Sequence, residues 1–147
     1  MTSPAAIVFK GSCFCKGIQY ECTSGTAQWI RCHCNMCKKL IGADHCSFLA
    51  VKESKLTLTS KDTMKTFRSS KEAVRSFCTN CGCSVLMKYD GEKSTIWINA
   101  GTLDQEIPVT RPTQIFLDDK AFWLDTMSTV PGSKDISNWE VDCAKDL

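Results

Sequence analysis

The segment FCTNCGC, residues 77–83, decides the fold of this chain. Its Cys78 and Cys81 form a C-x-x-C pair followed by Gly82, which is the pattern of a zinc knuckle. In a knuckle, two thiolates hold one ion, and the glycine lets the chain turn so that backbone N–H groups point at sulfur. A tetrahedral structural zinc takes four ligands, usually two from each of two knuckles. The pattern therefore predicts a second cysteine pair elsewhere in the chain.

That second pair stands near the start of the chain, in the segment GSCFCKG at residues 11–17. Cys13 and Cys15 complete a four-thiolate set with Cys78 and Cys81. We therefore expect one structural zinc that joins the first strand to the middle of the sheet. The alternative is that these four residues are ordinary buried cysteines.

Cysteine is the unusual residue of this sequence, with eleven copies among 147 residues. In a small secreted protein such a number indicates a disulfide framework. Here the count is odd, most cysteines stand in C-x-C or C-x-x-C clusters, and the N-terminal residues lack the pattern of a secretory signal. Neighbouring cysteines in a C-x-C pair can hardly bridge each other without strain. Metal ligation is therefore favoured over disulfides.

The composition is that of an ordinary globular protein, with 43% hydrophobic and 23% charged residues. We expect a single domain, with a core at about residues 11–125 and a tail at residues 126–147. The net charge of +2 does not indicate nucleic-acid binding, and no apolar run approaches the roughly 20 residues of a membrane span. The expected location is the cytoplasm, with the nucleus as the alternative. The sequence does not determine the oligomeric state.

Short segments in which apolar and polar residues alternate dominate the chain. Asp90-Gly91 stands between two of them, where a hairpin turn is expected. One short helix is expected at residues 35–40, with Gly42 as its C-terminal cap. These patterns predict an all-β sandwich or open barrel of short antiparallel strands. The expected strands are residues 17–24, 29–31, 45–52, 55–60, 64–70, 73–78, 84–89 and 94–100.

A second cluster, Cys32, Cys34 and Cys37, lies in RCHCNMCKKL at residues 31–40. It follows a strand-like segment and precedes the expected helix, whose N-terminus stabilises thiolates. Three protein ligands leave the fourth position of a tetrahedral zinc for water or substrate, which is the arrangement of a catalytic metal.

Two other interpretations of this second cluster stay open. A fourth protein ligand would close the site, and Cys46 and Cys83 are the favoured closers, because His33 lies between two ligands and is expected to point away. The full set of candidate closers is His33, His45, Cys46 and Cys83. Alternatively, Cys34 and Cys37 form a redox-active pair.

Together, the segments GSCFCKGIQY, CHCNMCKKLIGA, FCTNCG and WINAGTLD resemble the glutathione-dependent formaldehyde-activating enzyme family, which includes the centromere protein V group. The resemblance covers roughly residues 11–125 and rests on the order and spacing of all three clusters. It implies an Mss4-like all-β fold and carbon–sulfur lyase chemistry that interconverts S-hydroxymethylglutathione with glutathione and formaldehyde. It also implies two zinc ions per chain. The structural zinc matches Cys13, Cys15, Cys78 and Cys81, and the second zinc matches Cys32, Cys34 and Cys37.

Three positions depart from the pattern of this family. Lys38 stands where the family often has arginine, and Cys83 stands where a small hydroxyl residue is more familiar. Cys46 is an additional cysteine. The ligands therefore match the family, whereas the pocket around them can differ.

The expected mechanism uses the second zinc to bind a soft ligand such as a substrate thiol, beside a small carbonyl group. The flanking cations Arg31, Lys38 and Lys39 would balance the negative charge and meet the carboxylates of a glutathione-like substrate. The alternative is that these three are solvated surface charges.

A proton must also move, and the chain has two histidines. We take His33 as the favoured shuttle, with His45 beside Asp44 as the second candidate. The predicted catalytic residues are therefore Cys32, Cys34, Cys37 and His33.

Several other features have plainer interpretations. Trp97 and Trp123 are expected in the core, and Cys22 and Cys143 are expected to be small buried apolar residues. The mostly basic stretch at residues 61–75 is attributed to the solvated faces of paired strands rather than to nucleic-acid binding. The alternative function for the whole chain is a zinc-stabilised interaction module, in which both metals are structural and no reaction occurs.

Overall fold

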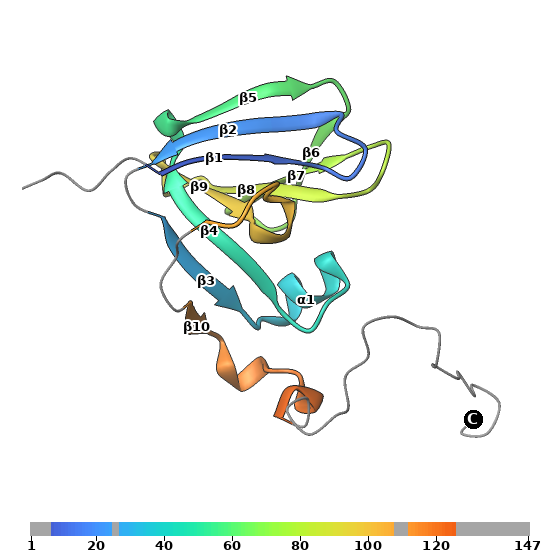
Figure 1. Ribbon diagram of the computed structural model, residues 1–147. Coiled ribbons are helices and arrows are strands. Elements are labelled where there is room, and N and C mark those ends of the chain that lie inside the picture. The colour runs from blue at the N-terminus through green and yellow to red at the C-terminus, as the bar shows by residue number, and fades with distance from the viewer. Residues whose placement is uncertain (1–6, 25–26, 108–111, 126–147) are drawn as a thin grey trace, which may run out of the picture.

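The computed structural model describes residues 7–24, 27–107 and 112–125. Within these ranges the chain forms ten strands, one α-helix and four short 3₁₀ helices (Figure 1). The strands are β1 (Ile7–Ser12), β2 (Ile18–Ser24), β3 (Gln28–Cys32), β4 (Cys46–Lys52), β5 (Leu56–Lys61), β6 (Met64–Arg68), β7 (Ala73–Cys78), β8 (Ser84–Tyr89), β9 (Thr95–Asn99) and β10 (Thr113–Ile115). The helices are α1 (Asn35–Ile41), η1 (Glu53–Lys55), η2 (Ala100–Thr102), η3 (Leu117–Asp119) and η4 (Phe122–Asp125).

The predicted all-β fold is confirmed, and each expected strand is present with ends that differ by at most a few residues. The Asp90-Gly91 turn joins β8 to β9, which pair antiparallel as expected. The helix is confirmed as well, and Gly42 closes it in the left-handed region at φ +69°. The sequence pattern assigned no strand to β1 or β10. β10 has only three residues and pairs parallel with β3, the one departure from antiparallel pairing among the described strands.

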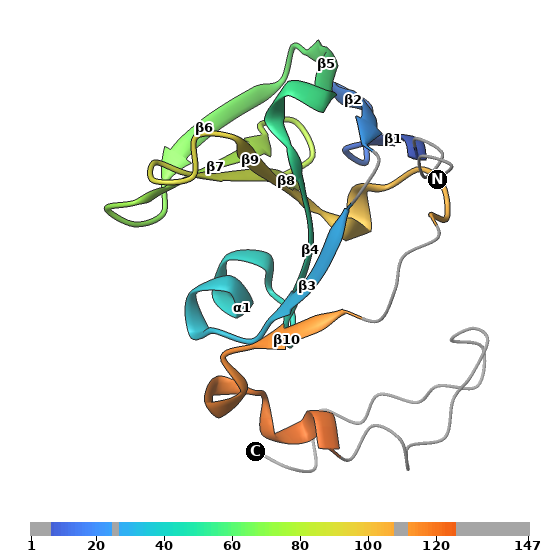
Figure 2. The ribbon, with the colours of Figure 1, turned by 90° about the vertical axis from the view of Figure 1, so that its left-hand side faces the viewer.

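The strands form two sheets. β1, β2 and β5 make a small sheet, and the large sheet has the order β10-β3-β4-β9-β8-β7-β6. Figures 1 and 2 show the small sheet lying over the β6–β9 part of the large one, while β3, β4 and β10 extend beyond it. The helix α1 packs beside this extension. The two sheets therefore form a sandwich at β6–β9, whereas the small sheet does not cover the end formed by β3, β4 and β10.

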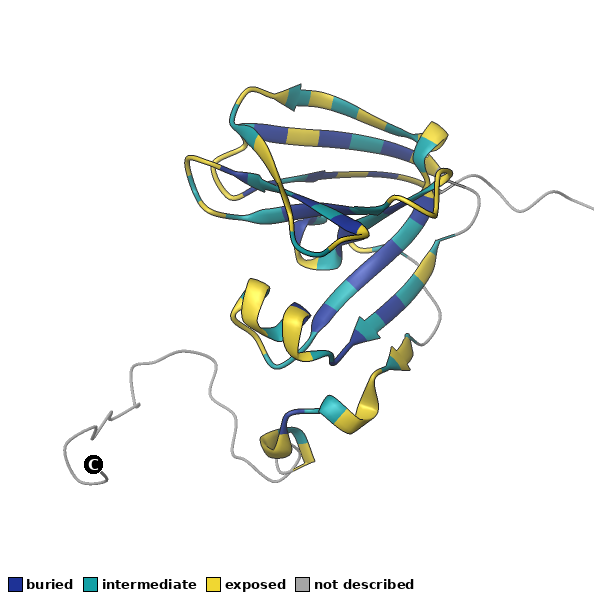
Figure 3. Cartoon of the chain, turned by 180° about the vertical axis from the view of Figure 1, so that it is seen from behind, coloured by how far each residue is buried: buried dark blue, intermediate teal, exposed yellow. Residues whose placement is uncertain are grey.

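The main core fills the space between the two sheets. Phe9, Ile18 and Tyr20 come from the small sheet, and Leu49 and Ile98 come from the large one. Burial alternates along the strands, as Figure 3 shows, because successive side chains of a strand point to opposite faces. Cys22 belongs to this core, as predicted.

Two expectations fall on parts of the chain that the structure does not describe. The tail at residues 126–147, with Cys143, lies outside the described residues.

Among the helices that are described, none has the length and apolar character needed to cross a membrane. The predicted location stays a prediction.

Candidate functional site

The first cysteine cluster lies where the loop after β1 meets the loop after β7. The sulfur atoms of Cys13 and Cys15 are 3.7 Å apart, and those of Cys15 and Cys78 are 3.5 Å apart. Cys81 completes the group, in which the four Sγ atoms all lie within 4.8 Å of one another. The structure thus brings together the four residues that the two knuckle patterns select.

Local backbone geometry at this cluster follows the knuckle pattern. The N–H of Ile18 donates to the Cys13 sulfur at 3.3 Å, and the N–H of Cys81 points to the Cys78 sulfur at 3.5 Å. Gly82 adopts φ +74°, in the left-handed region that glycine enters without steric cost. The knuckle formed by Cys78 and Cys81 therefore favours glycine at position 82.

The donor set of the first cluster fits zinc. Four sulfur ligands at about 2.3 Å from a tetrahedral ion stand about 3.8 Å from one another, close to the separations found here. Burial opposes ionisation of Cys78, but hydrogen bonds from the Thr63 hydroxyl and from the backbone of Cys81 and Asn80 lower its pKa to about 6. A thiolate at this position is what a metal requires.

The second cluster forms where β3 ends and α1 begins. Cys32 is the last residue of β3, and Cys34 caps the helix by accepting a hydrogen bond from the N–H of Cys37 at 3.3 Å. The three sulfur atoms lie within 4.8 Å of one another. Cys32 and Cys37 are buried, and Cys34 is half-buried. This donor set also fits a soft metal ion such as zinc.

No fourth protein ligand joins these three sulfurs among the residues that the structure describes. The Cys46 thiol donates to the side-chain oxygen of Asn99 at 3.2 Å, and burial raises its pKa to about 12. Cys83 lies at the other cluster, where its sulfur points to the carbonyl of Ser84. Cys46, Cys83 and His45 line a separate hollow together with Asn99. Cys46 stands opposite Cys32 in the β3–β4 pair, but neither its sulfur nor that of Cys83 belongs to the group of sulfurs that lie within 4.8 Å of one another.

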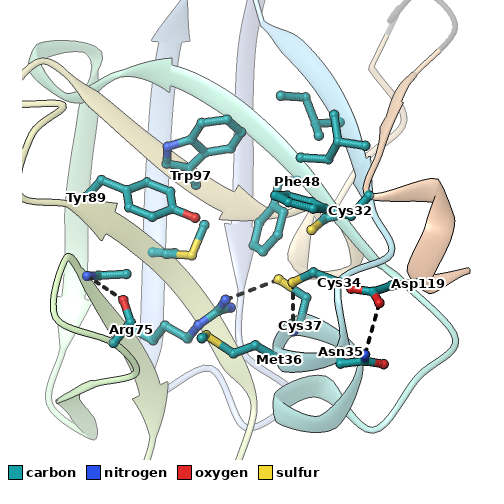
Figure 4. A pocket seen from close by; sticks show the side chains of 16 residues that line it. Cys32, Cys34, Asn35, Met36, Cys37, Phe48, Arg75, Tyr89, Trp97 and Asp119 are labelled. Carbon is teal, nitrogen blue, oxygen red and sulfur yellow. Dashed lines mark hydrogen bonds between the residues drawn. The ribbon is translucent and has the colours of Figure 1, made fainter.

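A buried arginine lies against the second cluster. Nη2 of Arg75 donates to the sulfur of Cys37 at 3.3 Å (Figure 4), and Nε donates to the Ser69 hydroxyl at 3.2 Å. The guanidinium also stands 5.8 Å from the centroid of the Phe48 ring. Its Nη1 is buried and has no hydrogen-bond partner in the described part of the chain. One cation thus compensates the charge of the thiolate cluster.

The electrostatics of Cys37 follow from these contacts. Hydrogen bonds from the Cys32 thiol and from Arg75 lower the pKa of Cys37 to about 5, although burial opposes ionisation. The pKa of Cys32 is raised, because its thiol is the donor in that hydrogen bond and is itself buried. The Cys37 sulfur is therefore a thiolate at neutral pH, with the Cys32 thiol and Arg75 as its hydrogen-bond donors.

The sulfurs of the second cluster face a cavity of about 390 Å³, which Figure 4 shows from close by. Arg75 and Asp119 are the charged side chains on its wall within the described residues. Most of the remaining wall is apolar and lies on the face of the large sheet that the small sheet does not cover. The larger apolar residues include Ile30, Phe48, Met87, Tyr89, Trp97 and Ile115.

Strand register explains how these side chains come together. Met87 of β8 stands opposite Arg75 of β7 and opposite Trp97 of β9. Tyr89 stands opposite Ala73. Directly paired residues of antiparallel strands point to the same face, and residues two apart in one strand share that face. The register therefore places all five residues on one surface beside the cysteines.

The cations predicted to bind substrate lie elsewhere. Lys38 and Lys39 line a different hollow, together with Trp123, and the ammonium of Lys38 donates to the backbone carbonyl of Asp119. Arg31 is not on the cavity wall either. The cation that does reach the cavity, Arg75, belongs to the stretch at residues 61–75 that the sequence attributed to solvated strand faces. That attribution is wrong for Arg75, which is 2% exposed.

His33 and the two tryptophans also need placing. The side chain of His33 is buried, and its Nε2 lies 2.9 Å from the side-chain oxygen of Gln114. His33 does not line the cavity. Trp97 lines the cavity, which the sequence had treated as the lesser alternative to a core position. The expectation of a core position is wrong for Trp123, which is 46% exposed. The register in which the strands pair is the signal that could have identified Arg75 and Trp97. The alternation of residues within one strand does not give this register.

Comparison with known proteins identifies a family and supports the fold. The family model for glutathione-dependent formaldehyde-activating enzyme matches residues 8–119. An uncharacterized lyase of Schizosaccharomyces pombe is 27% identical over 112 residues, which is 76% of this chain and 80% of that protein. A crystal structure of a Rhodobacter sphaeroides protein matches with a TM-score of 0.58 at 20% identity, over 71% of this chain and 98% of the other. At that identity the structural likeness concerns the fold alone.

Proposed function

This chain belongs to the glutathione-dependent formaldehyde-activating enzyme family, and we propose that it is a carbon–sulfur lyase acting on a thiol–aldehyde adduct. The name of the family makes S-hydroxymethylglutathione, formed from glutathione and formaldehyde, the first adduct to test. The lyase name of the Schizosaccharomyces pombe relative agrees with this reaction class.

One observation carries the proposal. The sulfurs of Cys32, Cys34 and Cys37 converge on a cavity of about 390 Å³, and no fourth protein ligand joins them within the described ranges. The first cluster, by contrast, has four sulfurs of its own. A structural metal site is closed by four protein ligands, whereas a catalytic site keeps a position for substrate. The two clusters thus fit different roles.

Cys32, Cys34 and Cys37 would hold and orient a zinc ion beside the cavity. Such an ion would supply a soft Lewis acid that favours the thiolate form of a substrate thiol. Three thiolates with one zinc carry a net charge of about −1, and a bound substrate thiolate adds to it. Arg75, against the Cys37 sulfur, is placed to offset this charge. Its Nη1 is buried and makes no hydrogen bond within the described residues, so a small rotation of the guanidinium would let this unused donor reach the oxygen of the adduct.

The proposed reaction breaks the O–H and C–S bonds of the adduct and forms a C=O bond. The hydroxyl group loses its proton, the oxygen forms the carbonyl of the aldehyde, and the electron pair of the C–S bond leaves with sulfur as thiolate. In the reverse direction the thiolate adds to the carbonyl carbon and the oxygen takes up a proton. A hydrogen bond from Arg75 would stabilise the negative charge on that oxygen.

The proton carrier stays a proposal with two competing assignments. His33 was assigned from the sequence, and its ring stands behind the cluster with Nε2 at Gln114. Tyr89 has its side chain on the cavity wall, and burial raises the pKa of its hydroxyl, which keeps it protonated at neutral pH. Substrate binding by Arg31, Lys38 and Lys39 likewise stays a prediction, and these residues would contact parts of the substrate outside the cavity.

The test is exchange NMR on mixtures of glutathione and formaldehyde, because the adduct also forms spontaneously and product detection alone decides nothing. We expect the zinc-loaded protein to accelerate exchange between free and adduct signals. Cys34→Ser should abolish the acceleration while retaining the fold. Cys83→Ser is the matched control, since this cysteine lies outside both sulfur groups.

A well-folded protein that carries both zinc ions and accelerates no exchange would contradict the formaldehyde reaction. If both zinc ions were in addition equally inert to chelators, the chain would instead be an interaction module with two structural metals.

A further inference from the structure

We propose that the cavity beside Cys32, Cys34 and Cys37 selects adducts whose aldehyde carbon carries an apolar group, aromatic or branched aliphatic. This inference rests on the lyase reaction proposed for the same site and names the class of substrate. It concerns the apolar residues of the cavity wall, because metal binding by the three cysteines does not by itself require them.

The wall opposite the sulfurs is a rigid aromatic surface. Trp97 meets the ring of Phe48 edge to face, with centroids 6.1 Å apart, and meets the ring of Tyr89 in the same way at 6.2 Å. The indole N–H donates to the carboxylate of Glu92 at 3.0 Å, which fixes the orientation of the ring. Met87, buried at 3% exposure, packs in one cluster with Phe48 and the cysteines and stands opposite Trp97 in the β8–β9 pair. Such a surface suits an apolar group.

The size of the cavity exceeds what formaldehyde needs. Formaldehyde adds one carbon and one oxygen to a thiol, and these two atoms occupy roughly the volume of two water molecules, about 60 Å³. The cavity measures about 390 Å³. Most of the space beside the reacting carbon would therefore stay unfilled by this aldehyde.

The cavity wall offers few partners for the charged groups of glutathione, so the tripeptide is not suited to fill the cavity. Glutathione carries two carboxylates and one ammonium group, and each costs free energy when it is buried without a partner. Arg75 and Asp119 are the charged side chains on the wall among the described residues. Arg75 already donates to Cys37 and to Ser69, and its remaining donor, Nη1, is assigned to the oxygen of the adduct. The Asp119 carboxylate already accepts from Asn35 at 3.1 Å.

The tripeptide would therefore extend out of the cavity, with its sulfur at the cysteines. The substituent of the aldehyde carbon is then the part of the adduct that packs on Phe48, Trp97 and Tyr89. Each CH₂ group buried on such a wall tightens binding about fourfold. A phenyl or isobutyl group should therefore gain at least about tenfold over hydrogen.

Stable thioethers measure binding to the cavity without the reaction. We would titrate the zinc-loaded protein with S-benzylglutathione and S-methylglutathione by isothermal calorimetry. The expected result is binding of the benzyl compound that is at least about tenfold tighter. Equal affinities, or no binding of the benzyl compound, would overturn the proposal.

Two variants locate the effect. Ala73→Leu places a larger side chain on the wall opposite Tyr89, and we expect it to reduce the benzyl-to-methyl affinity ratio to near one. If this variant does not fold, Trp97→Ala removes the wall instead and should reduce the same ratio. Phe122→Ala is the matched control, because Phe122 is an aromatic residue with 84% exposure outside the cavity, and the ratio should not change. An unchanged ratio in both wall variants would contradict the proposed location.

Exchange kinetics with a series of aldehydes complete the test. With glutathione as the thiol, kcat/KM should rise from formaldehyde to isovaleraldehyde and benzaldehyde by about tenfold or more. A protein that accelerates formaldehyde exchange but gains nothing from the larger aldehydes would retain the proposed function and lose this inference. A protein that binds S-benzylglutathione tightly but accelerates no aldehyde would lose the proposed function, and the apolar specificity would stand as a binding property.

Discussion

Nη2 of Arg75 donates to the Cys37 sulfur at 3.3 Å, although 38 positions separate the two residues in the chain. Arg75 reaches the cluster from β7, whereas Cys37 lies in the first turn of α1. A buried cation next to a thiolate fixes the charge of that thiolate and strengthens its bond to a metal. This contact links the large sheet to the metal site and leads to the first two predictions.

Replacing Arg75 with methionine should weaken zinc at the second cluster by about 10–100-fold, the usual cost of losing a hydrogen-bond partner of a metal ligand. The first cluster should be unaffected, because its sulfurs are held by other residues. Competition with a chromophoric chelator, which resolves two classes of zinc, measures the effect. Arg68→Met is the control, since Arg68 forms an exposed ion pair with Asp90. Equal weakening in both variants would show that the contact has no specific role.

The same contact gives a pH dependence. Arg75 donates to the Cys37 sulfur and lowers the pKa of this thiol, so protons compete less well with a metal for it. Removing Arg75 raises the pKa of Cys37, and protons then displace the metal at higher pH. We therefore expect Arg75→Met to move the midpoint of acid-induced zinc release at this cluster upward, by up to about one pH unit. Zinc release followed during a slow acid titration measures this shift, and an unchanged midpoint would contradict it.

The sequence predicted much of this fold and site because the informative signals are local. Knuckle spacing selects Cys13, Cys15, Cys78 and Cys81, and the C-x-C-x-x-C spacing selects the second cluster. Strand alternation and Gly42 locate most of the elements for the same reason. These patterns involve residues within a few positions of one another, where covalent geometry limits what the chain can do.

The wall of the cavity could not be predicted in this way. Arg75 and Trp97 meet the cluster only because β7, β8 and β9 pair in one particular register, with Met87 between them. A shift of one residue would turn all three side chains to the other face. Arg75 stands in a stretch of basic residues, and nothing in that stretch distinguishes it from a solvated charge. The register is set by the whole sheet, and therefore by contacts far apart in sequence.

The two clusters should respond differently to loss of one ligand. Cys78→Ser removes a ligand from the site that joins the loop after β1 to the loop after β7, and we expect severe destabilisation or failure to fold. Cys34→Ser should leave a folded protein that has lost one zinc equivalent. Zinc content by mass spectrometry of the native protein, together with thermal unfolding, distinguishes the two outcomes.

Chelation gives an independent check on the same distinction. A mild chelator should remove the zinc at Cys32, Cys34 and Cys37 first, while the circular dichroism spectrum stays unchanged. Removal of the second equivalent should unfold the chain. Simultaneous loss of both ions at the same chelator concentration would contradict separate structural and catalytic roles.

The proton carrier can be identified by comparing His33→Ala with Tyr89→Phe. Tyr89 lines the cavity and His33 does not, so we expect the larger change in the pH–rate profile from Tyr89→Phe, with kcat reduced about 10²-fold or more. His33→Ala should mainly affect stability, because it breaks the contact between Nε2 and Gln114. A profile that changes only in His33→Ala would restore the assignment made from the sequence. His45→Ala tests the second histidine candidate, and we expect no change in the profile, because His45 lines a separate hollow.

Close packing at Gly11 gives a prediction about stability alone. Gly11 stands opposite Tyr20 in the β1–β2 pair, and a Cβ atom at Gly11 would lie 2.0 Å from the hydroxyl oxygen of Tyr20 and 2.6 Å from the carbonyl oxygen of Thr102. The ring cannot easily move away, because it is buried and its hydroxyl lies 2.8 Å from the hydroxyl of Thr102. Gly11→Ala should therefore cost about 2–3 kcal/mol in the free energy of unfolding.

This cost corresponds to a fall in Tm of roughly 5–10 °C for a chain of this length. Gly101→Ala is the matched control, since no atom lies within 4 Å of the Cβ position there, and we expect a change of at most about 1 kcal/mol toward higher stability. Thermal unfolding of the zinc-loaded proteins measures both variants. Equal Tm values for the two variants would mean that the Tyr20 ring can move away from Gly11 at no cost in free energy. The hydrogen bond between Tyr20 and Thr102 would then contribute little to the stability of the core.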